Sequence, residues 1–142
     1  MRKYLFIALG GILGAISRFI IKNSHFIGFQ TSFPLNTFII NITGSFILAL
    51  VLTTAYEVWD FDEDIRIGIA AGFLGAYTTF STMCKETVSL INKEMYSLGL
   101  SYIILSTIIG LFSAYFGVIT ARKVISLIIK RKSSSEEESE AS

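Results

Sequence analysis

The chain has 142 residues, of which 52% are hydrophobic and 16% are charged, and its formal net charge is +1. Soluble domains carry about 25% charged residues, so this composition favours a membrane protein over a soluble domain. The small net charge gives no support for nucleic acid as a partner, and the single cysteine, Cys84, excludes an intramolecular disulfide.

Four apolar runs are long enough to cross a bilayer, because a membrane helix needs about 20 predominantly apolar residues. The runs cover residues 4–21, 34–56, 65–91 and 98–119. We therefore expect an all-α protein embedded in the lipid bilayer, with four transmembrane helices, short loops and a first run that is retained rather than cleaved. Residues 1–129 would form the transmembrane domain, and residues 130–142, which are basic and then rich in Ser and Glu, would form a disordered tail.

The first run contains small residues at helical spacing, with Gly10 four residues before Gly14 and Gly11 four before Ala15. Such pairs let two helix backbones approach closely. Arg18 lies near the end of this run. It is either an anchor at the membrane interface or a charge that attracts anions near an aqueous mouth.

The second run carries a polar face formed by Thr37, Asn41 and Ser45, which are spaced four residues apart. A side-chain amide without a partner in hydrocarbon costs several kcal/mol, so Asn41 is expected to face another helix or water. Helix–helix hydrogen bonding and pore lining both remain open for this face.

The third run is interrupted at residues 75–82, Gly-Ala-Tyr-Thr-Thr-Phe-Ser-Thr, where a membrane helix would be expected to continue. Irregular backbone at membrane depth is tolerated only where it is buried in protein or lines a wet cavity, so we expect a broken helix and an ion site. Lys85 and Glu86 follow within the same run. They mark an ion pathway, or else the hydrocarbon ends near Met83 and both are solvated.

The fourth run has a polar stripe of Tyr102, Ser106 and Gly110, again spaced four residues apart. This stripe either bonds to a neighbouring helix or forms a track for an ion.

The polar groups of the four runs are mostly hydrogen-bond donors, and Glu86 is the only carboxylate deep within a run. Donors suit an anion, and the ring edges of Phe side chains also carry partial positive charge. The inventory therefore points to a pathway for a small anion, without distinguishing fluoride from chloride.

Three motifs together resemble the small dual-topology fluoride channels of the Fluc, or CrcB, family. They are Gly11-x-x-Gly14-Ala15-x-x-Arg18, Asn41-x-x-Gly44-Ser45-Phe46 and Gly72-Phe73-x-Gly75-x-x-Thr78-Thr79-Phe80-Ser81-Thr82. The resemblance covers all four runs. It implies a fluoride-selective channel of the cell membrane that exports fluoride passively and confers fluoride resistance.

The resemblance also implies an antiparallel homodimer with two pores at the subunit interface. A structural sodium ion would sit at the dimer centre, held by the backbone carbonyls of Gly75 and Thr78 at the helix break. Arg18 would be structural or lie at a pore mouth. The fluoride pathway would include Thr37, Asn41, Phe80, Met83, Glu86, Tyr102 and Ser106.

Met83 departs from the family pattern, in which a second phenylalanine follows the first by three residues. Methionine fills similar space but has no aromatic ring edge. The departure is compatible with a weakened pore, a tolerated variant, or one half of a heterodimer with a paralogue that supplies the ring. We expect fluoride flux to survive in a homodimer, but to be slower or differently selective than after Met83→Phe.

The positive charges leave the topology open, because dual insertion requires little Lys/Arg bias between the two sides. Five lie on the amino-terminal side (Arg2, Lys3, Arg66, Arg122, Lys123) and four on the other (Arg18, Lys22, Lys85, Lys93). If Lys130, Arg131 and Lys132 count, the ratio becomes eight to four and favours one orientation.

Two other functions compete with a channel. A small proton-coupled cation or drug exporter would need an essential acidic group, for which Glu86 is the only plausible candidate. A scaffold packed through its glycine faces would transport nothing. The sequence contains no Ser-His-Asp arrangement, phosphate-binding loop or metal-ligand cluster, so we do not expect an enzyme.

Overall fold

The structure is a computed structural model that describes the chain except for residues 25–31, 58–61 and 141–142, with side chains described as far as Leu127. Its elements are α1 (Arg2–Asn23), α2 (Leu35–Glu57), α3 (Glu63–Ile67), the π-helix η1 (Gly68–Leu74), α4 (Gly75–Tyr77), α5 (Phe80–Asn92) and α6 (Tyr96–Glu140). Within the described residues, four helical stretches are long and apolar enough to cross a membrane: Arg2–Asn23, Leu35–Glu57, Glu63–Asn92 and Tyr96–Leu127. The predicted all-α fold with four spans is confirmed.

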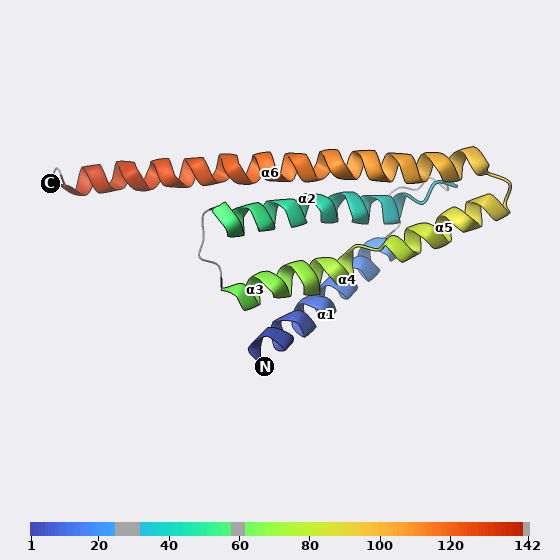
Figure 1. Cartoon of the computed structure of the whole chain (residues 1–142), viewed down its shortest axis with the longest axis horizontal. Coiled ribbons are helices and arrows are strands. Elements are labelled where there is room, and N and C mark those ends of the chain that lie inside the picture. Colours follow the sequence, from blue (N-terminus) through green and yellow to red (C-terminus); the bar gives the residue numbers. More distant parts are fainter. Residues whose placement is uncertain (25–31, 58–61, 141–142) are drawn as a thin grey trace.

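The helices form two packed pairs that meet at the third span (Figure 1). α2 lies along α6, and α1 crosses the first half of the third span, which consists of α3, η1 and α4. The close approach of α2 and α6 depends on Gly117, where an added Cβ would lie 2.5 Å from the carbonyl oxygen of Phe46.

Glycines also bring α1 against η1. An added Cβ at Gly10 would overlap the carbonyl oxygen of Gly68, and one at Gly14 would overlap that of Phe73. The predicted role of the small-residue pairs in close packing is therefore confirmed for these two positions. The π-helical geometry of η1 was not predicted, because hydrophobic periodicity does not separate a short π-helix from an α-helix.

The third span is broken between α4 and α5. Thr78 (φ −74°, ψ 154°) and Thr79 (φ −150°, ψ 107°) are extended, and α5 begins at Phe80. The Thr79 hydroxyl caps the new helix, because its Oγ1 accepts a hydrogen bond from the Thr82 N–H at 3.2 Å. The predicted interruption within residues 75–82 is confirmed.

α5 ends in a Schellman motif that turns the chain sharply into α6. Glu94 is left-handed (φ 62°), its N–H donates to the Ile91 carbonyl at 2.9 Å, and the Met95 N–H donates to the Leu90 carbonyl at 3.0 Å. The turn makes α6 antiparallel to α5 (Figure 1) and places Tyr102 of its polar stripe beside Glu86 of α5.

α6 continues well past residue 119, where the predicted apolar run ends. Ala121 and Ile125 are buried, and Arg122 forms an ion pair with Glu57 at the end of α2, with a nitrogen–oxygen distance of 2.7 Å. These contacts extend the helix past the last strongly apolar turn. The helix continues to Glu140, into the segment for which composition predicted disorder, and the domain division at residue 129 stays a prediction.

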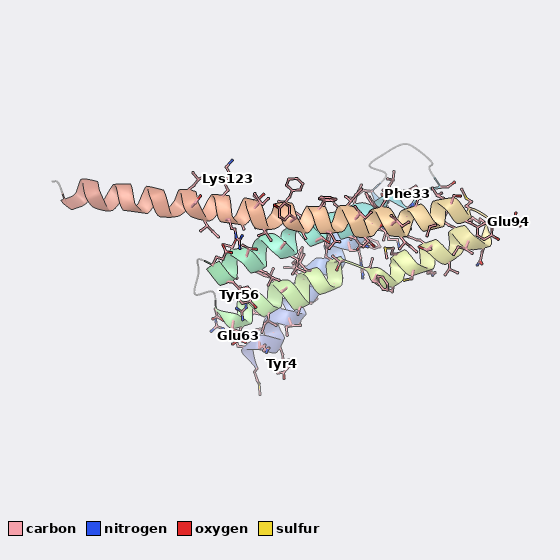
Figure 2. The ribbon with its side chains drawn as sticks, turned by 45° about the horizontal axis from the view of Figure 1, so that its top comes forward. Tyr4, Phe33, Tyr56, Glu63, Glu94 and Lys123 are labelled. Carbon is pink, nitrogen blue, oxygen red and sulfur yellow. The ribbon has the colours of Figure 1, made fainter. Side chains whose placement is uncertain are left out.

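Charged groups gather at the two ends of the spans. Arg2 pairs with Asp62 at 2.6 Å, at the same end as the Arg122–Glu57 pair. Figure 2 shows Tyr56 and Glu63 toward this end and Phe33 and Glu94 toward the opposite end. The apolar middle of the molecule, which contains the break, lies between them.

Candidate functional site

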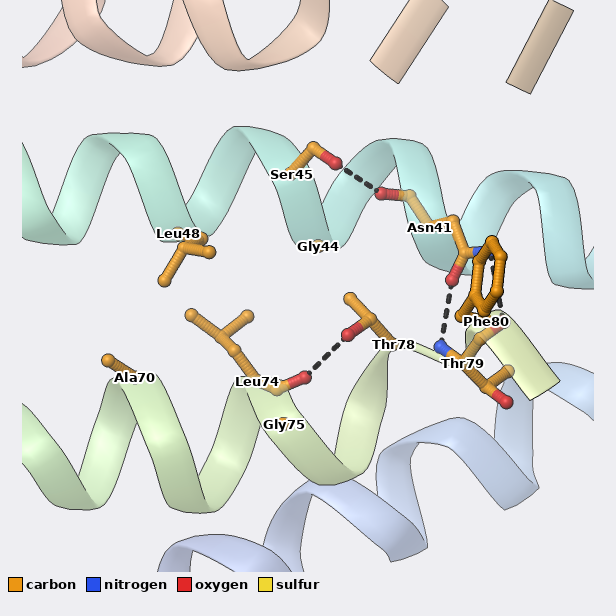
Figure 3. A pocket seen from close by; sticks show the side chains of 10 residues that line it. All are labelled: Asn41, Gly44, Ser45, Leu48, Ala70, Leu74, Gly75, Thr78, Thr79 and Phe80. Atoms are coloured by element: carbon orange, nitrogen blue, oxygen red, sulfur yellow. Dashed lines mark hydrogen bonds between the residues drawn. The ribbon is translucent and has the colours of Figure 1, made fainter. Parts of the chain in front are cut away.

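A hollow of about 330 Å³ opens beside the break (Figure 3). It lies between α2, the first half of the third span and the start of α5. Most of its wall is apolar, and Phe80 at its edge is 74% exposed in the single chain. The lining residues are Asn41, Gly44, Ser45, Leu48, Ala70, Leu74, Gly75, Thr78, Thr79 and Phe80.

Asn41 is bonded to the interrupted backbone. Its Oδ1 accepts from the Thr79 N–H at 2.9 Å, and its Nδ2 donates to the Thr79 carbonyl at 3.2 Å (Figure 3). The sequence left helix–helix bonding and pore lining open for this residue. In the structure Asn41 both bonds to the third span and lines the hollow, with one of its two Nδ2 hydrogens assigned to Thr79.

The break leaves the carbonyls of residues 75–78 without hydrogen-bond donors among the described residues, and Gly75 and Thr78 are two of these four. The Thr78 N–H and hydroxyl both donate to the Leu74 carbonyl, at 3.0 and 2.9 Å, and the Thr79 N–H goes to Asn41. In the described part of the chain, the carbonyls of Gly75 and Thr78 consequently accept no hydrogen bond. Gly75 and Thr78 both line the hollow, and oxygen atoms suit a hard cation, so these carbonyls could hold one.

Side chains do not offer a comparable cation site. No group of three or more His, Cys, Asp or Glu side chains that could hold a metal ion occurs among the residues described. Gly44 provides room for the break, because an added Cβ there would overlap the Thr78 side chain.

Three predicted site residues meet in a second polar cluster. Thr37 donates to Glu86 Oε1 at 2.8 Å, and Tyr102, which is 0% exposed, donates to Glu86 Oε2 at 2.9 Å. Each carboxylate oxygen therefore has a donor from a different helix, α2 or α6. As a result, the hydroxyl hydrogens of Thr37 and Tyr102, which the sequence offered to an anion, are bonded to a protein carboxylate in this structure.

Lys85 and Glu86 take different environments. Lys85 is exposed and Glu86 is half-buried. Adjacent helix residues point about 100° apart, which is why the two side chains do not face one site.

Ser106 lies one helical turn after Tyr102 on the same face of α6. Its Oγ is buried and has no hydrogen-bond partner among the described residues, and it is the one side-chain atom of this kind found there. Leaving a buried hydroxyl without a hydrogen-bond partner costs about 1–3 kcal/mol. Because a ligand or a water molecule could remove this cost, the Ser106 hydroxyl is available to donate to one.

Phe80 and Met83 do not face a common site within one chain. Met83 is 8% exposed and packs in an apolar cluster with Leu90 and Tyr102, whereas Phe80 faces the hollow. A pair of side chains at these positions in one chain therefore cannot line one wall together.

A second hollow, of about 440 Å³, lies on the α1 side of the break. Arg18 and Lys22 reach it from α1, and neither forms an ion pair within 4.0 Å among the described residues. The remaining lining residues include the hydroxyls of Thr79, Ser81 and Thr82. Unpaired positive charge in a concave site attracts anions, which suits the expectation of Arg18 near an aqueous mouth.

Sequence reasoning missed Lys22 as a member of this site. The signal was present, because Lys22 follows Arg18 by four residues and so lies on the same helix face.

The chain is similar to a family of known proteins over most of its length. A family model described as "CrcB-like protein, Camphor Resistance (CrcB)" matches residues 5–118. A protein of Carboxydothermus hydrogenoformans named "Fluoride-specific ion channel FluC 2" is 37% identical over 135 residues, which cover 95% of this chain and 98% of that protein. "Fluoride-specific ion channel FluC 1" of Moorella thermoacetica is 36% identical over 138 residues, covering 94% and 99%. "Fluoride-specific ion channel FluC" of Acidobacterium capsulatum is 35% identical over 123 residues, covering 87% and 98%.

Proposed function

We propose that this chain, which belongs to the CrcB family, is a fluoride-specific ion channel that lets fluoride leave the cell passively and so confers fluoride resistance. The observation that carries the proposal is the broken third span, whose extended backbone is bonded to Asn41 inside an otherwise apolar membrane protein. Backbone of this kind occurs at membrane depth where an ion or water is handled.

The donors that are not fully committed within the described chain suit a small anion. Moving a bare ion into low dielectric costs tens of kcal/mol, so donors must replace its water along the path. Ser106 has an uncommitted buried hydroxyl, and Asn41 has a second Nδ2 hydrogen beyond the one bonded to Thr79. Arg18 and Lys22 would raise the local anion concentration beside the break.

A structural sodium ion would fit at the break. Its ligands would be the carbonyls of Gly75 and Thr78, which have no donor in the described chain. Backbone oxygens satisfy a hard cation without a buried carboxylate, and the cation in turn would compensate the unpaired carbonyls.

The site is proposed to be completed by a second copy inserted antiparallel to the first, or by a paralogue. The hollow at the break is open to the surface of the single chain, Phe80 is largely exposed there, and an added Cβ at Gly75 would meet nothing within 4 Å. A second chain would cover this face and bring its own Phe80 toward the same region.

The function is tested by reconstituting the purified chain into liposomes and comparing fluoride with chloride efflux, with and without a proton gradient. We expect fluoride efflux without a proton gradient and little chloride efflux. Efflux that requires the proton gradient would instead support the exporter that uses Glu86, and no flux of either ion would support a scaffold.

Two neighbouring hydroxyls on α6 provide a matched pair of variants. Ser106→Ala removes the buried hydroxyl without a partner and should lower fluoride flux about tenfold, the change expected for about 1.4 kcal/mol of lost stabilisation. Thr107→Ala removes an exposed hydroxyl that donates to the Ile103 carbonyl of its own helix at 2.9 Å, and should leave flux unchanged. Equal flux in the two variants would remove Ser106 from the pathway.

A further inference from the structure

The pairing of Asn41 with Thr79 has the form of a β-bridge rather than of ordinary helix–helix bonding. Thr79 is extended, so its N–H and C=O point to the same side of the chain, and one carboxamide can bond to both. Two residues paired across antiparallel strands exchange bonds in the same way. Here a side chain on a helix takes the place of the neighbouring strand.

This pairing competes directly with the helix. In an unbroken α-helix, the Thr79 N–H would bond to the carbonyl four residues earlier, which is that of Gly75. Because Asn41 Oδ1 accepts this N–H instead, at 2.9 Å, the Gly75 carbonyl has no donor. The same contact therefore gives the Thr79 N–H a hydrogen-bond acceptor and leaves the Gly75 carbonyl oxygen available to an ion.

Two neighbours of Asn41 on α2 contact the two residues before Thr79. The Thr43 hydroxyl bonds to the Tyr77 hydroxyl at 2.8 Å, and Gly44 leaves the space that the Thr78 side chain occupies. One turn of α2 thus contacts three successive residues of the third span. A turn that only lined a pore would not need to match the backbone residue by residue.

We propose that Asn41 is a positioning residue that keeps the backbone of the third span extended at Thr79. By accepting the Thr79 N–H, it leaves the Gly75 carbonyl without a hydrogen-bond donor and therefore available to an ion. The part that concerns the ion rests on the proposed channel function. The part that concerns the backbone does not, and it is measured separately.

The first test follows the backbone of the full-length protein in detergent micelles by amide hydrogen exchange, detected by NMR with labelled threonine. Asn41→Ala removes both bonds to Thr79. We expect either exchange at the Thr79 amide to speed up about tenfold, or that amide to shift to the resonance of a helical threonine as it bonds to Gly75. An unchanged Thr79 amide, in both rate and resonance, would overturn the proposal.

A matched control lies one turn further along the same face of α2. Ser45 lines the same hollow, but its hydroxyl donates to the Asn41 carbonyl of its own helix at 2.9 Å and does not touch Thr79. Ser45→Ala should leave the Thr79 amide unchanged. A similar change in both variants would mean that the hollow as a whole, rather than the carboxamide, protects Thr79, and would overturn the proposal.

A second variant separates hydrogen bonding from space filling and serves if Asn41→Ala fails to fold. In Asn41→Asp the side chain keeps its size. When protonated it can still accept from the Thr79 N–H and donate to the Thr79 carbonyl, and when ionised it can only accept. Protection of Thr79, corrected for intrinsic exchange, should therefore approach that of the unchanged protein where the introduced carboxyl group is protonated and fall about tenfold where it is ionised, with its protonation state followed by NMR of the labelled side chain. Protection that stays equal to that of the unchanged protein while this carboxyl group loses its proton would overturn the proposal.

The other titratable groups packed around this position are the same in both proteins, so the unchanged protein corrects for them. They are Arg18 and Lys22 on α1, Tyr77 on α4, Glu86 on α5 and Tyr102 on α6.

The ion arm measures fluoride efflux from liposomes while sodium is varied. If Asn41 frees the Gly75 carbonyl, the sodium concentration for half-maximal flux should rise about tenfold in Asn41→Ala and stay the same in Ser45→Ala. A residue that only contacted fluoride would lower flux without changing this sodium concentration, and that result would overturn the ion part. If the unchanged protein carries no fluoride at all, the proposed function fails while the exchange data still decide the backbone part.

Discussion

The two halves of the third span are held in different ways. The first half, α3 to α4, meets α1 through glycines, so that backbone touches backbone near Gly10, Gly14, Gly68 and Gly72. The second half, α5, is held by side chains, through the Glu86 cluster and the apolar packing of Met83 and Leu90 against Tyr102. The break lies between the part of the span that is packed through backbone contacts and the part that is packed through side chains. Backbone contact produces a rigid support, whereas side-chain contact places polar groups that an ion can use.

The largest expected effect comes from adding one carbon atom to the backbone contact of the first half. In Gly14→Ala the new Cβ would overlap the Phe73 carbonyl, so the helices must separate. We expect the free energy of unfolding to fall by about 2–3 kcal/mol, measured by denaturation in mixed micelles. Gly11→Ala is the control, because its nearest neighbour is 4.0 Å away, and it should be neutral or slightly stabilising. Equal losses in the two variants would contradict backbone packing as the cause.

A somewhat smaller effect is expected in the Glu86 cluster of the second half. Glu86→Ala leaves the buried hydroxyls of Thr37 and Tyr102 without their acceptor and should lower the free energy of unfolding by about 1–2 kcal/mol. Glu86→Gln keeps one acceptor oxygen and should cost about half as much. Lys85→Ala, which changes an exposed neighbour, should have little effect. If removing Glu86 costs no more than removing Lys85, the cluster does not hold α5.

Met83→Phe tests the apolar packing of the second half together with its transport role. The larger ring enters a buried site and should lower the free energy of unfolding by about 1 kcal/mol. Fluoride efflux from liposomes should be slower or differently selective in the unchanged protein than in this variant. Val88→Phe places a ring on an exposed part of α5 and is the control for added bulk. Identical flux and selectivity before and after Met83→Phe would refute the transport difference.

The smallest effect on the single chain is expected at Gly75, at the end of the first half. Its backbone is right-handed helical and nothing lies within 4 Å of an added Cβ, so Gly75→Ala should change the free energy of unfolding of the chain by less than about 0.5 kcal/mol. Under the proposed antiparallel dimer, the same variant should weaken association about tenfold, measured by subunit exchange in micelles. Unchanged association would show that no second chain approaches this position.

Much of the fold could be predicted from the sequence because the bilayer imposes a length on each apolar run. The four spans, the glycine contacts at Gly10 and Gly14, and the interruption within residues 75–82 follow from this constraint and from local residue types. The end of α6 could not be predicted, because the contacts of Ala121 and Ile125 and the Arg122–Glu57 pair extend it, and these join residues far apart in the chain.

The candidate site was predicted as an inventory, without its pairings. Thr37, Glu86 and Tyr102 were each identified, but the sequence does not contain the information that the two hydroxyls donate to the one carboxylate. It likewise offered Phe80 and Met83 as neighbours on one helix, whereas packing turns the first toward the hollow and buries the second.

Hydropathy, the length of the apolar runs and local residue types are properties of the chain alone, so they were enough to predict a membrane protein with four helices and a break in the third. The partner that each polar group takes became known only from the packing of the helices. Hydrogen bonds depend on which atoms of distant helices come within about 3 Å, and the choice of the Thr79 N–H between Gly75 and Asn41 is made by the packing of α2 against the third span.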